Sequence, residues 1–406
     1  MHRRGTDLEM RDGLQHPVAV MGLPINSLTA DEAVGTLEHL ILSGGTHQVC
    51  AMNLDTWLNA LTDAHLHRIV AGSSMVFPDG MPLVWASGLL GCPLAERVTG
   101  VDLVPRLAEL SARKGYKIFL LGAKPGVAER VSRLLERNYP GVQIVGTFAP
   151  VEENLIRMDH TEILRQIHAV SPDILLVAFG NPKQEKWIWM HRRRLGVPLS
   201  MGVGGSFDIL VGDMRRAPRW VQKCGLEWAM RFLQEPVRLG PRYLRDFAGL
   251  ARRLPMALLA AWCQRPYLGQ SRVTTAPTPQ VMHVNIHGRL GAEIATAVQD
   301  ATAASIVNGL VMVVHLHSVK QVTAAGLGVL LGARRQLLEA GLSLSLAGLN
   351  LKTCFVLYAW NLQRLFDEWQ PAISRSRPLA AEVEPHTHMR LRSEQDVIPA
   401  ETRIRG

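Results

Sequence analysis

An acidic and a basic residue frame one amphipathic stretch, residues 76–102, and this pairing could do chemistry. Asp79 lies in the FPDG turn at 77–80, directly after a short apolar run, and Arg97 immediately precedes a predicted helix. A carboxylate held at a strand end can accept a proton, and a guanidinium at a helix start can hold an anion. The alternative stays open, because Pro-Asp-Gly is a common turn and an Arg before a helix is often an ordinary surface residue.

The elements that must position these two residues alternate along the chain. Apolar runs predict strands, with helices between them, at residues 18–23, 48–52, 76–77, 117–121, 142–145, 173–179 and 198–203. This alternation predicts a Rossmann-like α/β fold, a mostly parallel sheet with helices on both faces. Ligands of such sheets bind beyond the carboxyl ends of the strands. The residues found there are Asn53, Asp79, Gly122, Gln184 and Gly204.

Glycine-bearing turns follow three of the predicted strands. Backbone N–H groups at Gly122, Gly180 and Gly204 could approach a phosphate closely. None of these turns matches G-x-G-x-x-G or the P-loop, so neither a dinucleotide-binding protein nor an NTPase is supported. Ordinary strand-to-helix turns are the alternative.

Composition limits the possible partners and the compartment. The chain has 406 residues, which favours two domains, and a formal net charge of +9. This charge predicts an anionic partner: phosphate, nucleic acid or a membrane surface. Its five cysteines are dispersed without a C-x-x-C pair, which indicates reduced thiols in the cytoplasm. We expect no signal peptide and no transmembrane helix, because no apolar run approaches the ~20 residues that span a bilayer.

Residues 215–270 form a basic appendage to the predicted α/β domain at 18–214. Between 215 and 253, ten Lys or Arg and three Asp or Glu give +7 of the total charge, interleaved with aromatic and leucine side chains. A basic amphipathic helix of this kind is typical of proteins that lie on anionic membranes. Nucleic acid would fit the charge equally well, but no recognised nucleic-acid module surrounds it. A solvated helical face is the alternative for any single Arg.

The order and spacing of several motifs resemble the WecG/TagA/CpsF glycosyltransferase family. These motifs, within residues 18–250, are FPDG, ERVTGVDL, FLLGAKPGVAER, GNPKQEKW, MGVGGSFDILVGDMRRAPRW and GLEWAMRFLQEPVRL. The resemblance implies a bacterial enzyme on the cytoplasmic face of the membrane. It would transfer a sugar, such as N-acetylmannosamine or its uronic acid, from a UDP-sugar to a polyprenyl-diphosphate-linked saccharide. It also implies inversion at the anomeric carbon without a metal or other cofactor.

The same resemblance implies roles for individual residues. Asp79 matches the proposed general base and Arg97 an arginine of the pocket, while Asn53 and Gln184 match residues that contact the sugar or the acceptor. Arginines of the appendage would close over the diphosphate, and these correspond to Arg231, Arg238 and, displaced by one position from Pro241, Arg242. Some members have Thr where this chain has Ala51, so a hydroxyl contact from that position is missing.

The chemistry of an inverting transfer fits this set. It needs a base for the acceptor hydroxyl and positive charge for the departing diphosphate, and arginines can supply that charge in place of a metal. No D-x-D element stands in the catalytic region. We expect the H-x-H pairs at 65–67 and 315–317 to face solvent rather than to bind a metal.

A second, smaller α/β domain is predicted at residues 281–373, after a linker at 271–280. The segments HVNIHGRLGAE and VMVVHLHSVKQVTAAGLGVLLGARRQLLEAGLSLSLAGL resemble a STAS domain, and the resemblance implies a module that docks a protein partner. Ala324 replaces the phosphoacceptor Ser of that family, and Thr323 is expected to cap the helix that follows. Residues 1–17 and 374–406 are predicted to be disordered.

The sequence therefore predicts a hexosyltransferase for cell-surface or exopolysaccharide synthesis, with a sugar of the N-acetylmannosamine type, its uronic acid, or glucose. Its partners would be a UDP-sugar donor, a lipid-linked acceptor and an anionic membrane surface, without nucleic acid. The alternative is a non-catalytic scaffold that binds nucleotide or lipid and uses the STAS-like domain for regulation. A basic nucleic-acid binder is a third reading, and it predicts salt-sensitive binding to DNA or RNA.

Overall fold

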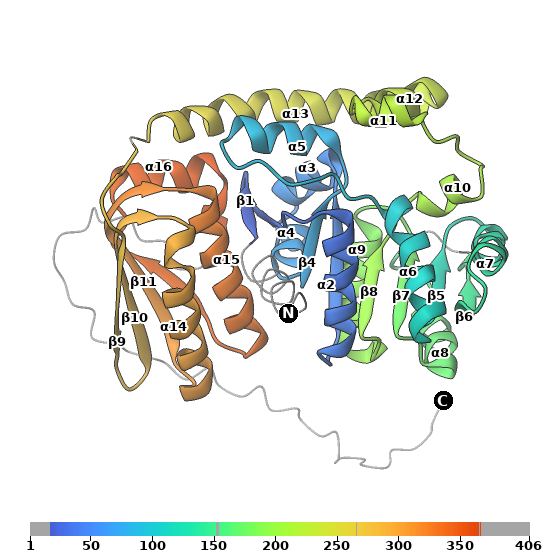
Figure 1. Cartoon of the computed structure of the whole chain (residues 1–406), viewed down its shortest axis with the longest axis horizontal. Coiled ribbons are helices and arrows are strands. Elements are labelled where there is room, and N and C mark those ends of the chain that lie inside the picture. The colour runs from blue at the N-terminus through green and yellow to red at the C-terminus, as the bar shows by residue number, and fades with distance from the viewer. Residues whose placement is uncertain (1–16, 152–153, 265, 365, 367–406) are drawn as a thin grey trace, which may run out of the picture. The chain divides into compact units, whose positions relative to one another are not determined.

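A computed structural model describes residues 17–151, 154–264, 266–364 and 366 (Figure 1). The predicted disordered leader, apart from Pro17, and the predicted tail at 374–406 lie outside the described residues.

A six-stranded sheet, entirely parallel, forms the centre of the first part of the chain. Its strand order is β4-β3-β8-β7-β5-β6. The strands are β3 (His47–Met52), β4 (Met75–Pro78), β5 (Lys117–Gly122), β6 (Gln143–Phe148), β7 (Ile174–Ala178) and β8 (Leu199–Gly202). Every side chain of β7 is buried, as expected for a strand covered on both faces. The predicted fold class is confirmed.

Helices cover both faces of this sheet (Figure 1). They are α2 (Ala30–Leu42), α3 (Leu54–Thr62), α4 (Ala64–Ala71), α5 (Met81–Leu89), α6 (Gly100–Lys114), α7 (Val127–Asn138), α8 (His160–Val170), α9 (Lys183–Leu195) and α10 (Ser206–Leu210). Alternate residues of β7 point into different cores. Ile174 and Leu176 pack with α6 and α7, whereas Leu175 and Val177 pack with Trp187 of α9. The predicted capping box of Thr29 and Glu32 begins α2.

Two predicted elements are divided in the structure. The strand predicted at 18–23 is a pair of short antiparallel strands, β1 (Val18–Val20) and β2 (Leu23–Ile25). The chain turns between them because Met21 and Gly22 both have positive φ. The helix predicted at 56–71 is divided into α3 and α4 at Asp63. The carboxylate of Asp63 accepts from the backbone N–H groups of the next helix and so starts a new turn.

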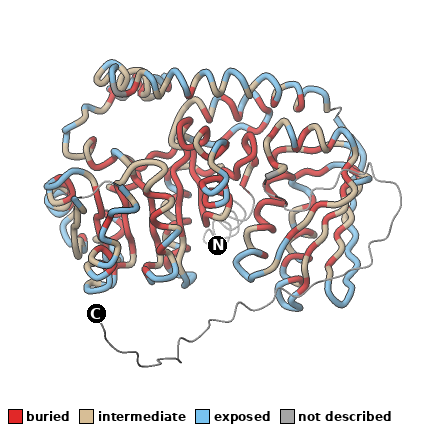
Figure 2. Tube along the Cα trace, turned by 180° about the vertical axis from the view of Figure 1, so that it is seen from behind, coloured by how far each residue is buried: buried red, intermediate tan, exposed pale blue. Residues whose placement is uncertain are grey.

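The basic appendage forms three helices, α11 (Arg219–Lys223), α12 (Glu227–Gln234) and α13 (Pro236–Trp262). The long helix α13 buries small side chains such as Ala257 and Ala260, and its outer edge is exposed (Figure 2). Among the described residues, none of the helices combines the length and apolarity required to cross a bilayer.

The C-terminal part contains a separate four-stranded sheet in the order β12-β11-β10-β9. Its elements are β9 (Arg272–Pro277), β10 (Val281–Leu290), η1 (Ala292–Ile294), α14 (Ala295–Asn308), β11 (Val311–Val322), α15 (Ala324–Glu339), β12 (Leu344–Ala347), α16 (Leu351–Ala359) and η2 (Leu362–Arg364). Most of the predicted linker at 271–280 is therefore strand β9. This stretch is ordered as a strand because its backbone pairs antiparallel with β10. Thr323 caps α15 as predicted, accepting from Gly326 N at 3.1 Å.

Candidate active site

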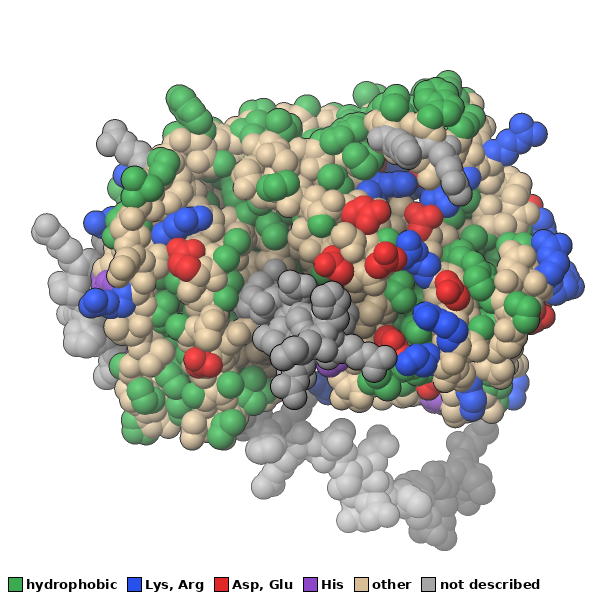
Figure 3. Space-filling model, in the orientation of Figure 1, with side chains coloured by type: hydrophobic (Ala, Val, Ile, Leu, Met, Phe, Trp, Pro, Cys, Tyr) green, Lys and Arg blue, Asp and Glu red, His purple; other side chains and the backbone are tan. Residues whose placement is uncertain are grey.

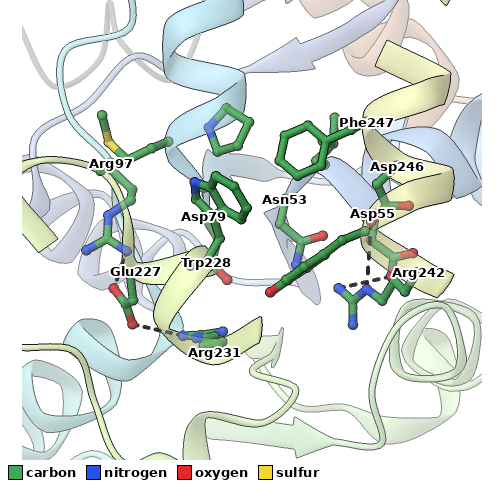
Figure 4. Close-up of a pocket in the computed structure, with 16 residues that line it drawn as sticks. Asn53, Asp55, Asp79, Arg97, Glu227, Trp228, Arg231, Arg242, Asp246 and Phe247 are labelled. Atoms are coloured by element: carbon green, nitrogen blue, oxygen red, sulfur yellow. Dashed lines mark hydrogen bonds and ion pairs between the residues drawn. The ribbon is translucent and has the colours of Figure 1, made fainter. Parts of the chain in front are cut away.

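Two adjoining cavities lie beyond the carboxyl ends of β3 and β4, beneath α12 and α13. The polar cavity, of about 380 Å³, extends over the turns with Gly180 and Gly204 and the helix starts with Gln184 and Asp208. The apolar cavity, of about 90 Å³, is walled by Met81, Pro82, Trp228 and Phe247. Their common wall consists of Asn53, Asp55, Asp79, Arg231, Arg242 and Tyr243. Figure 4 shows residues that line the apolar cavity.

Asp79 stands on this common wall. Its backbone N–H donates to the carbonyl of Met52 at 2.8 Å, which ties the turn after β4 to the end of β3. Removal from bulk water raises the pKa of Asp79 to about 7, against the opposing effect of Arg231 and Arg97. A carboxylate with such a pKa is well suited to accept a proton near neutral pH.

Arg97 and Arg231 are brought together by a residue that the sequence analysis did not single out. Glu227, in the first turn of α12, accepts from Arg97 Nη1 at 2.7 Å and from Arg231 Nη2 at 3.1 Å (Figure 4). Burial raises the pKa of Glu227, but the two arginines outweigh it and the net pKa is lowered. Glu227 is therefore a charged carboxylate at neutral pH. The i,i+4 spacing to Arg231 was the one local signal that could have found it.

Asn53 and Gln184 both line the polar cavity, and both also hold backbone turns. The Asn53 Oδ1 accepts from Thr56 N at 2.9 Å and caps α3. The Gln184 Oε1 accepts from the backbone N–H groups of Gly180 and Gly204, at 3.1 and 3.0 Å. The Gly204 N–H, predicted to face a phosphate, is therefore engaged by Gln184 in this structure.

Glu185 lies directly behind Gln184 and was not predicted from the sequence. It is buried, and it accepts from Gln184 Nε2 at 2.8 Å and from Asn181 Nδ2 at 3.0 Å. Burial raises the pKa of Glu185 to about 7, although these hydrogen bonds act in the opposite direction. The Gln184–Glu185 pair therefore orders the wall of the polar cavity.

The structure describes the side chain of Arg242 but not that of Arg238. Arg242 lines both cavities and pairs with Asp55 at 3.2 Å and Asp246 at 3.8 Å. Arg238 lies in the N-terminal part of α13, and its side chain lies outside the described part of the structure. Asp55 was not predicted, because only the fold brings it to Arg242. Asp246 was not predicted either, although its i,i+4 spacing to Arg242 in α13 is a local signal that could have found it.

Gly122 does not line either cavity. It lines a different one, of about 280 Å³, with Lys124, Phe179 and Lys183. Its φ is +97°, and an added Cβ would lie 2.9 Å from the Ala178 carbonyl oxygen and 2.7 Å from the Phe179 ring. Close packing beside β7 therefore requires glycine here, independently of any phosphate.

Each histidine pair meets the expectation in one residue only. His65 and His317 are exposed, but His67 is buried at 1% exposure, because it falls on the inner side of α4. His315 is partly buried and lies 3.0 Å from His283, nitrogen to nitrogen. Within the described residues, no group of three or more His, Cys, Asp or Glu side chains is arranged to hold a metal ion.

A comparison with known protein families gives the class of this protein. Residues 18–265 match the model of the family described as "Glycosyl transferase WecG/TagA/CpsF family". This is more than half of the chain, so the chain belongs to this family of glycosyltransferases. The match ends before β9 and does not include the C-terminal sheet.

Curated relatives carry one more specific name. A Bacillus subtilis (strain 168) protein named N-acetylglucosaminyldiphosphoundecaprenol N-acetyl-beta-D-mannosaminyltransferase is 32% identical over 190 residues, 47% of this chain and 72% of the relative. A Staphylococcus aureus (strain MW2) protein of the same name is 28% identical over 247 residues, 59% of this chain and 95% of the relative.

Proposed function

We propose that this enzyme transfers an amino sugar of the N-acetylmannosamine type from a UDP-sugar to a polyprenyl-diphosphate-linked saccharide. The observation that carries the proposal is the position of Asp79, on the wall shared by two cavities and beside Arg97 and Arg231. The printed names of the relatives support this acceptor and this class of sugar. A uronic acid or glucose in the donor remains the alternative for the sugar itself.

Asp79 acts as the general base in this proposal. Its carboxylate takes the proton of the acceptor hydroxyl as that oxygen attacks the anomeric carbon. The bond from the anomeric carbon to the diphosphate oxygen breaks at the same time, and UDP leaves with the electron pair. Attack from the face opposite to UDP inverts the anomeric carbon. The donor and the acceptor must therefore approach Asp79 from different sides, as two adjoining cavities allow.

The linings favour a particular assignment of the two cavities. The polar cavity contains Asn53, Asn181 and Ser206, which can hydrogen-bond a UDP-sugar. The apolar cavity contains the rings of Trp228 and Phe247, which suit the apolar faces of an acceptor sugar or the start of its lipid. We assign the donor to the polar cavity and the acceptor to the apolar cavity.

Arginines of the appendage supply the positive charge for the departing diphosphate. Arg231 and Arg242 line both cavities, and Arg238 is placed between them in the sequence. A guanidinium can hold two phosphate oxygens at once, so arginines can do the work that a divalent metal does in other transferases. Arg242 would exchange Asp55 and Asp246 for phosphate when the donor binds. Transfer without a metal stays part of this proposal.

The appendage also brings the site to the lipid acceptor. Large apolar side chains along α12 and α13 are exposed, including Leu233, Val237, Leu244 and Trp262, and Figure 3 shows hydrophobic side chains along the upper edge, where α13 lies in Figure 1. With the basic residues of 215–253 this surface fits the anionic inner face of a cell membrane. We propose peripheral attachment there.

The C-terminal sheet is proposed to be a STAS-like module that docks a protein partner. Its mixed four-stranded sheet with helices is compatible with this reading. Membership of a glycosyltransferase family favours the enzyme over the non-catalytic scaffold for the first part of the chain.

One experiment tests the proposed activity. The purified protein is incubated with a panel of UDP-sugars and an N-acetylglucosamine-diphosphate-polyprenol acceptor in mixed micelles, and UDP release is measured. Acceptor-dependent release with one donor, lost in Asp79→Asn, is the expected result. Equal release by wild type and Asp79→Asn would contradict the role of the carboxylate, and failure of every UDP-sugar to bind would contradict the activity. Chelating divalent metals should leave release unchanged.

A further inference from the structure

Glu227 holds two arginines of the candidate site at once. Its Oε2 accepts from Arg97 at 2.7 Å and its Oε1 from Arg231 at 3.1 Å. The Glu227 side chain is only 8% exposed, so water competes weakly for these bonds. Arg97 stands before α6 in the six-stranded domain, whereas Glu227 and Arg231 lie one turn apart in α12. The docking of α12 therefore decides how far apart the two guanidinium groups lie.

We propose that Glu227 is a positioning residue of the transfer reaction, which holds Arg97 and Arg231 beside Asp79 and offsets part of their positive charge there. This inference rests on the proposed function, because it takes Asp79 as the base. Glu227 also lines the apolar cavity, but in this proposal it acts through the two arginines. A guanidinium carries five N–H donors, and Glu227 engages one nitrogen of each arginine, so further donors remain for phosphate oxygens.

The charged groups around Asp79 show why the negative charge of Glu227 matters. Arg97 and Arg231 favour the ionised form of Asp79, and Glu227 and Asp102 oppose it. Asp102 is already paired with Arg216 at 2.6 Å. The other charged or titratable groups that line the two cavities with Asp79 are Asp55, Asp208, Arg242, Tyr243 and Asp246.

Glu227 is thus the carboxylate bonded to both cations beside the base. Without it, Arg97 and Arg231 would act on Asp79 uncompensated, and the pKa of Asp79 would fall. The carboxylate would then be ionised at lower pH but would accept a proton less readily from a hydroxyl, so the base would be weaker.

The pH dependence of kcat/KM separates this role from a purely structural one. In Glu227→Gln, we expect the acid limb to move down by about one pH unit and the plateau of kcat to fall severalfold. Glu227→Asp keeps the charge but shortens the side chain. It should therefore retain the acid limb of the wild type, while KM for the donor rises because the arginines are no longer held at the same separation. A loss of folded protein alone would lower the whole profile without moving its limb.

Glu162→Gln is the matched control, because Glu162 also pairs with an arginine, Arg165, but on the surface of α8. Its pH profile should equal that of the wild type. Suppose that the wild type is active and that its activity depends on Asp79. An unshifted acid limb in Glu227→Gln would then overturn the inference about Glu227 and leave the proposed function intact. Activity that persists in Asp79→Asn would instead overturn the proposed function.

A second measurement does not depend on turnover. In protein labelled with ¹³C at aspartate carboxyl carbons, one signal should titrate near pH 7 and disappear in Asp79→Asn. The same signal should titrate about one pH unit lower in Glu227→Gln. A titration that is unchanged in Glu227→Gln contradicts the inference whether or not a suitable acceptor has been found.

Discussion

Asp55 and Arg242 form an ion pair across the candidate site, with Asp55 Oδ2 3.2 Å from Arg242 Nη2. Asp55 lies in the first turn of α3, and Arg242 belongs to α13, so this pair ties the appendage to the six-stranded domain. Arg245 bonds the same carboxylate, and Asp246 contacts both arginines. Figure 4 shows Asp55, Arg242 and Asp246 together. The two carboxylates are buried, whereas the arginines are about half exposed.

Asp55→Asn should therefore loosen α13. The change leaves Arg242 and Arg245 with Asp246 as their remaining partner. We expect the free energy of unfolding to fall by about 1–3 kcal/mol, less than for a fully buried ion pair, because water screens the half-exposed arginines. Urea unfolding measures this loss. Asp31→Asn is the control, because Asp31 pairs with Arg106 but is 89% exposed, and its loss should stay within about 1 kcal/mol. Equal losses in both variants would contradict the structural role of Asp55.

The raised pKa of Asp79 predicts how stability depends on pH. The folded protein holds a proton on Asp79 up to about pH 7, whereas the unfolded chain releases it near pH 4. Between about pH 4 and 7 only the unfolded chain releases this proton, so stability falls progressively as the pH rises, and the whole loss is present above 7. Asp79→Asn should be more stable than the wild type at pH 8, by up to about 4 kcal/mol, and nearly equal at pH 4.

Thermal unfolding of the two proteins at both pH values measures this difference. Glu185 also has a raised pKa, but it is present in both proteins and cancels in the comparison. A stability difference that does not depend on pH would mean that Asp79 ionises in the fold as in the unfolded chain.

Gly122→Ala distinguishes packing from phosphate binding. The new Cβ would lie against the Ala178 carbonyl oxygen and the Phe179 ring, so stability should fall by about 2 kcal/mol or more, while the folded fraction binds UDP with unchanged affinity. Gly126→Ala is the matched control, since Gly126 has φ +82° but nothing within 4 Å of its added Cβ. It should show only the smaller backbone strain, of about 1 kcal/mol. Calorimetric titration with UDP would expose a specific loss of affinity in Gly122→Ala, which would restore the phosphate role.

Trp360→Ala should destabilise the C-terminal half of α13. Trp360 is 2% exposed, and its indole N–H donates to the Ala257 carbonyl of α13 at 3.4 Å. Removing a buried indole costs about 3–5 kcal/mol when the cavity does not collapse. Hydrogen exchange should then increase in residues 254–264 more than in α6. Equal protection of α13 in both proteins would show that α16 does not hold this helix.

Local patterns along the chain were sufficient to predict the elements and the class of fold. Runs such as 173–179 predict a strand because a strand buried on both faces must be apolar throughout, and Thr29 with Glu32 predicts a helix start from local hydrogen bonding alone. Strand ends also located Asn53, Asp79 and Gln184 on one cavity wall, because parallel strands end at the same edge.

Which charges from distant segments meet depends on how the helices pack over the sheet. Arg97 and Glu227 are 130 positions apart, and Arg245 and Asp55 are 190 apart. No local pattern encodes such pairs, because they form only when α12 and α13 pack over the strand ends. Gly122 shows the opposite case: its strand end was predicted, but only the fold places it beside Phe179 and away from Asp79. Periodicity along the chain records burial, whereas the charge balance around a base depends on groups that packing brings together.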